Sequence, residues 1–101
     1  MKQFKEDEVV IMMFSHHSVI GRFGEYDKEG RYFTIKNPRI ITTSEGDNPA
    51  PQMKSEFYGD PEEVVFREND AIVMYEVGDK SVETMYLKEV TGLSLASKVV
   101  Q

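Results

Sequence analysis

Two stretches of the chain are hydrophobic at consecutive positions, whereas a strand with one face in solvent alternates. Residues 8–14 read EVVIMMF and residues 71–77 read AIVMYEV, and each has the length of a strand. A strand without alternation indicates that both of its faces are covered. Two such strands in a small antiparallel protein need a cover for their second faces or their edges, and a partner subunit is the simplest one.

Residues 19–26 predict a second strand, joined to the first by a short polar turn at residues 15–18. This strand contains Gly21 and Gly24. Glycine weakens the interior of a strand, so its presence there usually marks a sharp bend or a close approach of two backbones. We therefore expect the second strand to bend.

A third strand is predicted at residues 31–36, after a turn in which Gly30 stands where a positive φ is expected. Asn37-Pro38 breaks or bends this strand, and residues 39–43 are a candidate continuation.

Residues 44–51 (SEGDNPAP) form the clearest loop of the chain, and its length suggests an excursion instead of a tight hairpin. A fourth strand is indicated over residues 52–58 and, after an interruption, over residues 63–67. Residues 68–70 then predict a tight turn before the second hydrophobic run.

The end of the chain has the pattern of a helix. Asp79 is a favourable N-cap, and the spacing that follows predicts a helix over residues 80–91, with Gly92 as its stop. Residues 93–101 show no firm pattern. Five strands, one of them bent at glycine, and one C-terminal α-helix predict an all-β protein built as a small antiparallel barrel or sandwich.

Composition narrows the class of protein. The chain has 101 residues, of which 40% are hydrophobic and 11% aromatic, which fits a single folded domain over residues 1–101 and excludes a disordered chain. Because there is no cysteine, there is neither a disulfide framework nor a thiolate zinc site.

The net charge of −6 speaks against a protein that coats duplex DNA through bulk positive charge. The acidity is unevenly distributed, however. Residues 1–43 hold seven Lys and Arg against six Asp and Glu, whereas residues 44–101 hold five against twelve. A local site for nucleic acid therefore stays compatible with the overall charge, although salt would weaken it.

The sequence indicates neither a signal peptide nor a membrane segment. Residues 1–8 are rich in charge, and the longest apolar run, at residues 9–14, is far shorter than the roughly 20 residues that a membrane helix needs. We therefore expect a cytoplasmic protein that does not contact a membrane.

Two segments carry a resemblance to a known family. The first is Gly21-Arg22-Phe23-Gly24-Glu25-Tyr26-Asp27, which fits the pattern Gly-x-apolar-x-x-x-Asp and lies between two apolar strands. The second is the run from Phe66-Arg67 through Asn69-Asp70 to an apolar strand, with Glu68 where the family has glycine. Together they resemble the two motifs of Sm and Sm-like (LSm) proteins, and with the C-terminal helix they look like small Sm-like proteins of marine phages.

The resemblance implies a fold and an assembly. It implies a strongly bent five-stranded antiparallel barrel over residues 8–77, with residues 44–51 as a variable loop. Members of the family build closed rings by pairing the fourth strand of one subunit with the fifth strand of the next. We therefore expect a homo-oligomeric ring, which would also cover the hydrophobic strand at residues 71–77.

The resemblance also implies a site for single-stranded RNA at the pore of the ring. In the family a base stacks between two side chains and a third side chain reads its edge; the positions here are Glu29, Arg67 and Arg31. Only Arg67 matches in residue type. Glu29 cannot stack as an aromatic ring does and repels phosphate, whereas Arg31 can stack on a base or contact phosphate. The predicted nucleic-acid-binding residues are Lys28, Glu29, Arg31, Tyr32, Arg39, Arg67 and Asn69.

A plainer interpretation of the same residues stays open. Arg31 and Arg67 would then be surface arginines paired with Glu29, Glu68 or Asp70, which contributes little stability. Asn69 and Asp70 would simply form the turn. Of the neighbouring aromatic residues, Phe33 is expected in the core and Tyr32 on the surface, where it can stack.

The sequence shows no arrangement that predicts catalysis. His16-His17 is expected to be a plain turn, because adjacent histidines point to different sides and no third ligand is placed near them. No cofactor or metal is expected, and the carboxylates of residues 62–70 are expected to form a solvated acidic face. The sequence therefore predicts a non-enzymatic ring that binds single-stranded RNA or DNA in nucleic-acid processing or regulation, and the alternative is a structural ring that binds protein.

Overall fold

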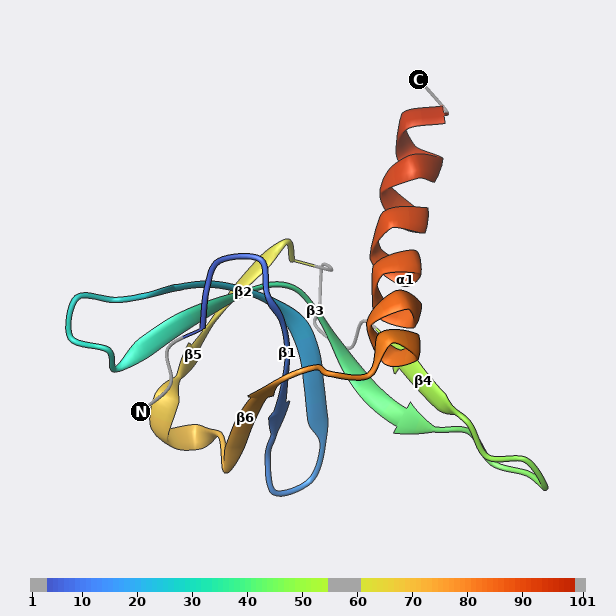
Figure 1. Ribbon diagram of the computed structural model, residues 1–101, viewed down its shortest axis with the longest axis horizontal. Coiled ribbons are helices and arrows are strands. Elements are labelled where there is room, and N and C mark those ends of the chain that lie inside the picture. Colours follow the sequence, from blue (N-terminus) through green and yellow to red (C-terminus); the bar gives the residue numbers. More distant parts are fainter. Residues whose placement is uncertain (1–3, 55–60, 100–101) are drawn as a thin grey trace.

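The computed structural model describes residues 4–54 and 61–99, with side chains as far as residue 91 (Figure 1). The described residues are mostly antiparallel β-sheet with one C-terminal helix, as the sequence predicts. In chain order the elements are β1 (Val9–Met13), β2 (Ser18–Tyr26), β3 (Tyr32–Thr43), β4 (Pro51–Lys54), β5 (Glu63–Arg67), the 3-10 turn η1 (Glu68–Asp70), β6 (Val73–Glu76) and α1 (Lys80–Val99).

The strands lie in the order β4-β3-β2-β1-β6, and every pair is antiparallel. β5 adds to the same edge of β3 as β4 does, but it pairs with residues 32–36, whereas β4 pairs with residues 40–43. Among the described strands, β5 is paired only with β3 and β6 only with β1. Each of these two strands therefore has one edge without a partner strand in the described chain.

The described part has six strands, whereas the sequence predicts five, because the predicted fourth strand is divided. β4 covers its first residues and β5 covers its continuation at residues 63–67, while residues 55–58 of the prediction lie outside the described residues. The loop between β3 and β4 closes a hairpin: the Ser44 amide donates to the Ala50 carbonyl at 2.8 Å, and the Ala50 amide donates to Ser44 Oγ at 3.0 Å.

Both faces of β1 are covered, as its unbroken hydrophobic pattern predicts. Val9 and Ile11 belong to a cluster that includes Tyr86 and Val90 of α1. On the other face, Val10 and Met12 belong to a second cluster, which includes Phe23 of β2 and Phe33 of β3. The protein's own helix is therefore the cover of one face of β1, and this face needs no partner subunit.

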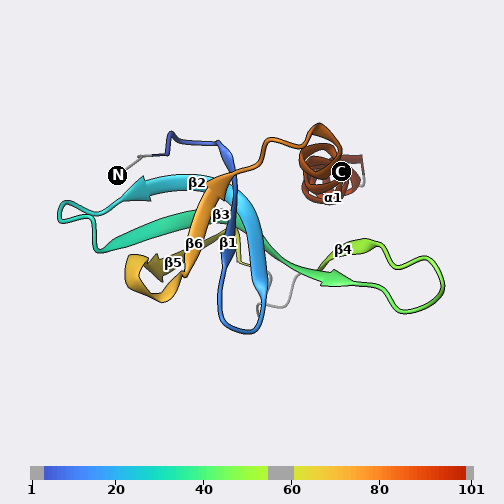
Figure 2. The same cartoon turned by 60° about the horizontal axis from the view of Figure 1, so that its bottom comes forward.

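β6 differs from β1 in this respect. Ile72, Val73 and Tyr75 are 69%, 45% and 43% exposed, although they belong to the second unbroken hydrophobic run. Figures 1 and 2 show α1 on the side of the sheet near β4, away from the turn between β2 and β3. The single chain therefore covers one of its two hydrophobic strands and leaves much of the other exposed.

The bend predicted at Gly21 is present and has a clear cause. β2 and β3 change register between Ile20 and Arg22, so Asn37 and Pro38 form a bulge opposite Gly21. Asn37 adopts a positive φ of 47°, which asparagine tolerates better than most residues do. The carbonyl oxygen of Lys36 would lie 3.1 Å from a Cβ at Gly21, and the side chain of Ile35 would overlap it.

The helix α1 begins where the sequence predicts but ends later, at Val99 instead of residue 91. Asp79 caps its start, because the Asp79 carboxylate accepts hydrogen bonds from the Ser81 amide at 2.8 Å and from Ser81 Oγ at 2.7 Å. Gly92 therefore lies inside the helix. A single glycine there costs only about 1 kcal/mol, and the leucines and alanine that follow it favour helix. No helix of the described residues has the length and hydrophobicity to cross a membrane.

Candidate nucleic-acid interface

The turn between β2 and β3 is held in shape by the aspartate that ends the first motif. Asp27 Oδ1 accepts hydrogen bonds from the Arg31 amide at 2.8 Å and from the Tyr32 amide at 3.2 Å. Gly30 adopts a φ of 72°, as expected for its place in the turn, and its amide donates to the Asp27 carbonyl at 3.1 Å. The turn therefore presents residues 28–31 in a defined conformation.

This turn lies directly beside the junction between β5 and η1. The Glu68 amide donates to the Arg31 carbonyl at 2.9 Å, and Tyr32 stands opposite Arg67 in the register of β3 and β5. The structure thus brings Arg67 to the same surface as Arg31 and Tyr32, although about a third of the chain separates them. Tyr32 is 43% exposed and Phe33 is buried, as the sequence predicts.

Both arginines are already engaged by neighbouring carboxylates. Arg31 Nε lies 3.0 Å from Glu29 Oε2, and Arg67 donates from Nε and Nη2 to the two carboxylate oxygens of Asp70 at 3.0 Å each. The hydrogen bonds that Arg67 donates to Asp70, and then the negative charge of Asp70, raise the pKa of Arg67. All four side chains are half-exposed or more, so water screens each pair, and the pair contributes little stability and can open to a stronger ligand.

The charges on this surface nearly cancel. Lys28, Arg31 and Arg67 are cationic, whereas four carboxylates lie on the same turn and on the junction: Asp27, Glu29, Glu68 and Asp70. Lys28 and Asn69 are exposed, with Lys28 in the turn and Asn69 within η1. Any nucleic acid bound here would be held by a few stacking contacts and hydrogen bonds instead of by a strongly positive electrostatic potential.

Arg39 does not belong to this surface. Its side chain is only 2% exposed, and Nη1 donates to the Pro38 carbonyl at 3.0 Å. The bulge at Asn37 and Pro38 places Arg39 opposite Ile20, on the face of the sheet that the cluster with Tyr86 and Val90 of α1 covers, and this cover buries it. In the single chain, Arg39 is therefore not accessible to a nucleic acid.

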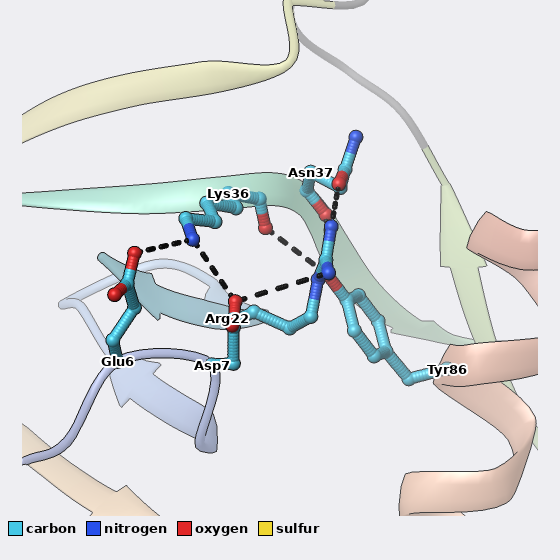
Figure 3. A network of polar contacts seen from close by, with 6 residues as sticks. All are labelled: Glu6, Asp7, Arg22, Lys36, Asn37 and Tyr86. Atoms are coloured by element: carbon cyan, nitrogen blue, oxygen red, sulfur yellow. Dashed lines mark hydrogen bonds and ion pairs between the residues drawn. The ribbon is translucent and has the colours of Figure 1, made fainter.

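A polar network that the sequence does not reveal fastens the bend of β3. Figure 3 shows its six members, which are Glu6, Asp7, Arg22, Lys36, Asn37 and Tyr86. Lys36 Nζ donates to Glu6 Oε2 at 2.9 Å and to Asp7 Oδ1 at 3.0 Å, and these two hydrogen bonds raise the pKa of Lys36. Arg22 donates to the side-chain oxygen of Asn37 and lies 3.9 Å from Asp7 Oδ1.

The helix contributes the last member of the network. Tyr86 is fully buried, and its hydroxyl donates to the backbone carbonyls of Lys36 at 3.1 Å and Asn37 at 2.9 Å (Figure 3). Burial raises the pKa of this hydroxyl. The helix therefore supplies a hydrogen-bond donor to two backbone carbonyls at the bulge of β3. At the level of sequence, Tyr86 shows only a helical spacing that marks it as a core residue.

His16 and His17 lie in the turn between β1 and β2. The Phe14 amide donates to the His17 carbonyl at 2.8 Å, and the Phe14 and His17 rings stack with centroids 5.3 Å apart. Within residues 4–54 and 61–91, histidine, aspartate and glutamate side chains form no group of three that would hold a metal ion. The hydrogen bond and the ring contact with Phe14 account for the position of His17 in the turn.

No model of a known protein family matches the chain, and no curated protein matches it. The candidate function therefore rests on the residues gathered where the β2–β3 turn meets the junction of β5 and η1.

Proposed function

We propose that the protein is a non-catalytic, ring-forming Sm-like protein that binds single-stranded RNA, or single-stranded DNA, where the β2–β3 turn meets the β5–η1 junction. The observation that carries the proposal is the hydrogen bond between the Glu68 amide and the Arg31 carbonyl, together with the pairing of Tyr32 with Arg67. These contacts gather two arginines and one exposed aromatic ring. Such side chains bind bases by stacking and phosphates by charge.

The fold supports the assembly part of the proposal. The strands that correspond to the fourth and fifth strands of an Sm-like barrel are β5 and β6, and each has an edge without a partner strand in the described chain. Val65 on β5 is 63% exposed, and Val73 and Tyr75 on β6 are also exposed. Pairing β5 of one subunit with β6 of the next would cover these residues and close the barrel-like sheet into a ring.

A ring would also raise the affinity for nucleic acid. One subunit offers two arginines that are partly neutralised by Glu29 and Asp70, so a single site is weak. Several copies around a pore bind one strand at once, and avidity can exceed the affinity of one site by about 10²–10⁴. The proposed cationic and stacking residues are Arg31, Arg67, Tyr32 and Lys28, while Arg39 is not retained.

The test is binding of fluorescent oligo-U, oligo-A and mixed single strands at low and moderate salt. We expect binding at low salt that weakens as salt rises, because phosphate contacts release counterions. Arg31→Glu and Arg67→Glu should each lower affinity about tenfold or more, with the ring intact, because each replaces a cationic contact by a repulsive one. Lys54→Glu is the matched control, because Lys54 is an exposed cation on β4. Absence of binding at tens of micromolar protein in low salt would refute the proposal.

One observation favours a second function, a structural ring that binds protein. Both arginines are paired, and Glu68 brings a further negative charge to the same surface. Affinity capture followed by nuclease treatment separates the two functions. Partner proteins that survive the nuclease, combined with no binding of single strands, would favour the protein-binding ring.

A further inference from the structure

An open groove with a volume of about 730 Å³ lies beside the second hydrophobic cluster, and none of its described lining residues belongs to α1. The N-terminal segment, β2, β3, η1 and β6 all contribute to its walls. Its aromatic residues are Phe4, Tyr26, Phe33 and Tyr75, and its charged residues are Glu68 and Glu76. A volume of this size is in the usual range for a small-molecule site, about 300–1,000 Å³.

The aromatic walls are fixed by packing. The Tyr26 ring lies with its centroid 4.8 Å from that of Phe23 and 6.2 Å from that of Phe33, in a tilted and an edge-on arrangement. The Phe4 ring lies with its centroid 5.8 Å from that of Phe23. Tyr75 pairs with Ile11, so its side chain lies on the other face of β6 from Met74. The faces of aromatic rings carry partial negative charge and attract cations.

The charge at the groove has one sign. Glu68 and Glu76 line it, and none of the described lining residues is lysine, arginine or histidine. The negative charge of Glu68 acts on Tyr26, where burial and then this carboxylate raise the pKa of the phenol. Glu68 and Tyr26 both line the groove. The nearby arginines bind other carboxylates, Arg31 with Glu29 and Arg67 with Asp70.

We propose that this groove binds a small organic cation with an apolar body, of the aryl- or alkylammonium class. Carboxylates and aromatic faces both favour a cation, and the apolar walls favour a hydrophobic body attached to it. The same charges disfavour an anion, so the expected ligand differs from nucleic acid. The groove adjoins the proposed surface for nucleic acid at Glu68, but the proposal does not rest on that function. Glu68, which stands where the Sm-like pattern has glycine, would then supply negative charge for the bound cation.

Three water-soluble probes of related shape and different charge test the proposal. They are benzyltrimethylammonium, benzyl alcohol and phenylacetate, each titrated into the full chain and followed by amide chemical shifts in NMR. We expect saturable shifts at Ala71, Met74 and Tyr75 with the cation, about tenfold weaker binding of the alcohol, and no binding of the anion. Equal binding of the cation and the alcohol would overturn the proposal, as would shifts confined to another surface.

Two variants identify the groups responsible. Glu68→Gln keeps the shape of the side chain but removes its charge, and it should lower the affinity for benzyltrimethylammonium about fivefold or more. Phe4→Leu keeps an apolar side chain at the groove but removes an aromatic face, and a similar loss is expected. Glu45→Gln is the matched control, because Glu45 lies in the β3–β4 loop and should leave binding unchanged. If Glu68→Gln also leaves binding unchanged while the variant folds normally, the cation site is refuted.

Discussion

At Gly21 two backbones approach so closely that the Cα has room only for hydrogen. An added methyl group would overlap the side chain of Ile35 and press on the carbonyl of Lys36 at 3.1 Å. Ile35 is fully buried and cannot move aside without disturbing the second cluster. The close approach therefore follows directly from the bulge that bends the sheet at this point.

We expect Gly21→Ala to lower the free energy of unfolding by about 1–3 kcal/mol, the usual cost of overpacking a well-filled core. Urea denaturation followed by circular dichroism measures the change. Gly78→Ala serves as the control, because an added Cβ there meets nothing within 4 Å, and its stability should match or slightly exceed that of the wild type. A Gly21→Ala protein within about 0.5 kcal/mol of the wild type would contradict the packing argument.

At the same scale, the environment of some residues could be predicted from the sequence and that of others could not. Gly21, Gly30 and Phe33 could be placed from sequence, because each reflects a local rule on backbone freedom or on burial. Arg39 could not, since the bulge places it on the face of Ile20, and only the three-dimensional path of α1 shows that this face is covered. An Asn-Pro pair indicates a break in a strand, but it does not state how many residues the break inserts.

At the scale of elements, the contact between α1 and the bend of β3 joins parts of the chain that are distant in sequence. The Tyr86 hydroxyl satisfies the carbonyls of Lys36 and Asn37, while the Tyr86 ring fills the cluster over Val9 and Ile11. Periodicity predicts the helix and its start at Asp79, because caps and spacing are local. It cannot reveal which strand the helix packs against, nor that α1 continues through Gly92.

We expect Tyr86→Phe to lower the free energy of unfolding by about 1–2 kcal/mol at neutral pH, because the part-buried carbonyls of Lys36 and Asn37 lose the hydroxyl hydrogen that they share. The pH dependence gives a second readout. Burial raises the pKa of Tyr86 in the folded protein, so its contribution is complete below the unfolded pKa of about 10 and is lost as pH rises through the folded pKa. The difference in stability between wild type and Tyr86→Phe should therefore shrink above about pH 10.

Tyr32→Phe is the control for this experiment, because Tyr32 is an exposed tyrosine and its hydroxyl has no comparable burial. Its stability should stay within about 0.5 kcal/mol of the wild type at neutral pH. A Tyr86→Phe protein as stable as the wild type would show that water or a rearrangement of β3 satisfies the two carbonyls equally well.

For the whole molecule, the two unbroken hydrophobic strands have different solutions. β1 is covered on both faces within one chain, by the cluster under α1 and by the cluster on the other face. The strand that contains Val73 and Tyr75 keeps exposed hydrophobic side chains and a strand edge without a partner in the described chain. Sequence pattern shows that both strands need a cover, but only the three-dimensional path of α1 shows which one the chain covers itself.

The exposed edge predicts that the protein assembles. Light scattering after size exclusion should give a mass that is a multiple of 11.6 kDa, because a long-lived monomer would leave Ile72, Val73 and Tyr75 in water. Val73→Lys places a charge in the proposed contact between subunits. The dissociation constant of the assembly should therefore rise about tenfold or more, while the far-UV circular dichroism spectrum stays unchanged. Thr84→Lys adds the same charge to an exposed position of α1 and should leave the mass unchanged. A wild-type protein that remains a monomer at high concentration would contradict both the ring and the pairing of β5 with β6, because the edges of both strands would then be stable in solvent.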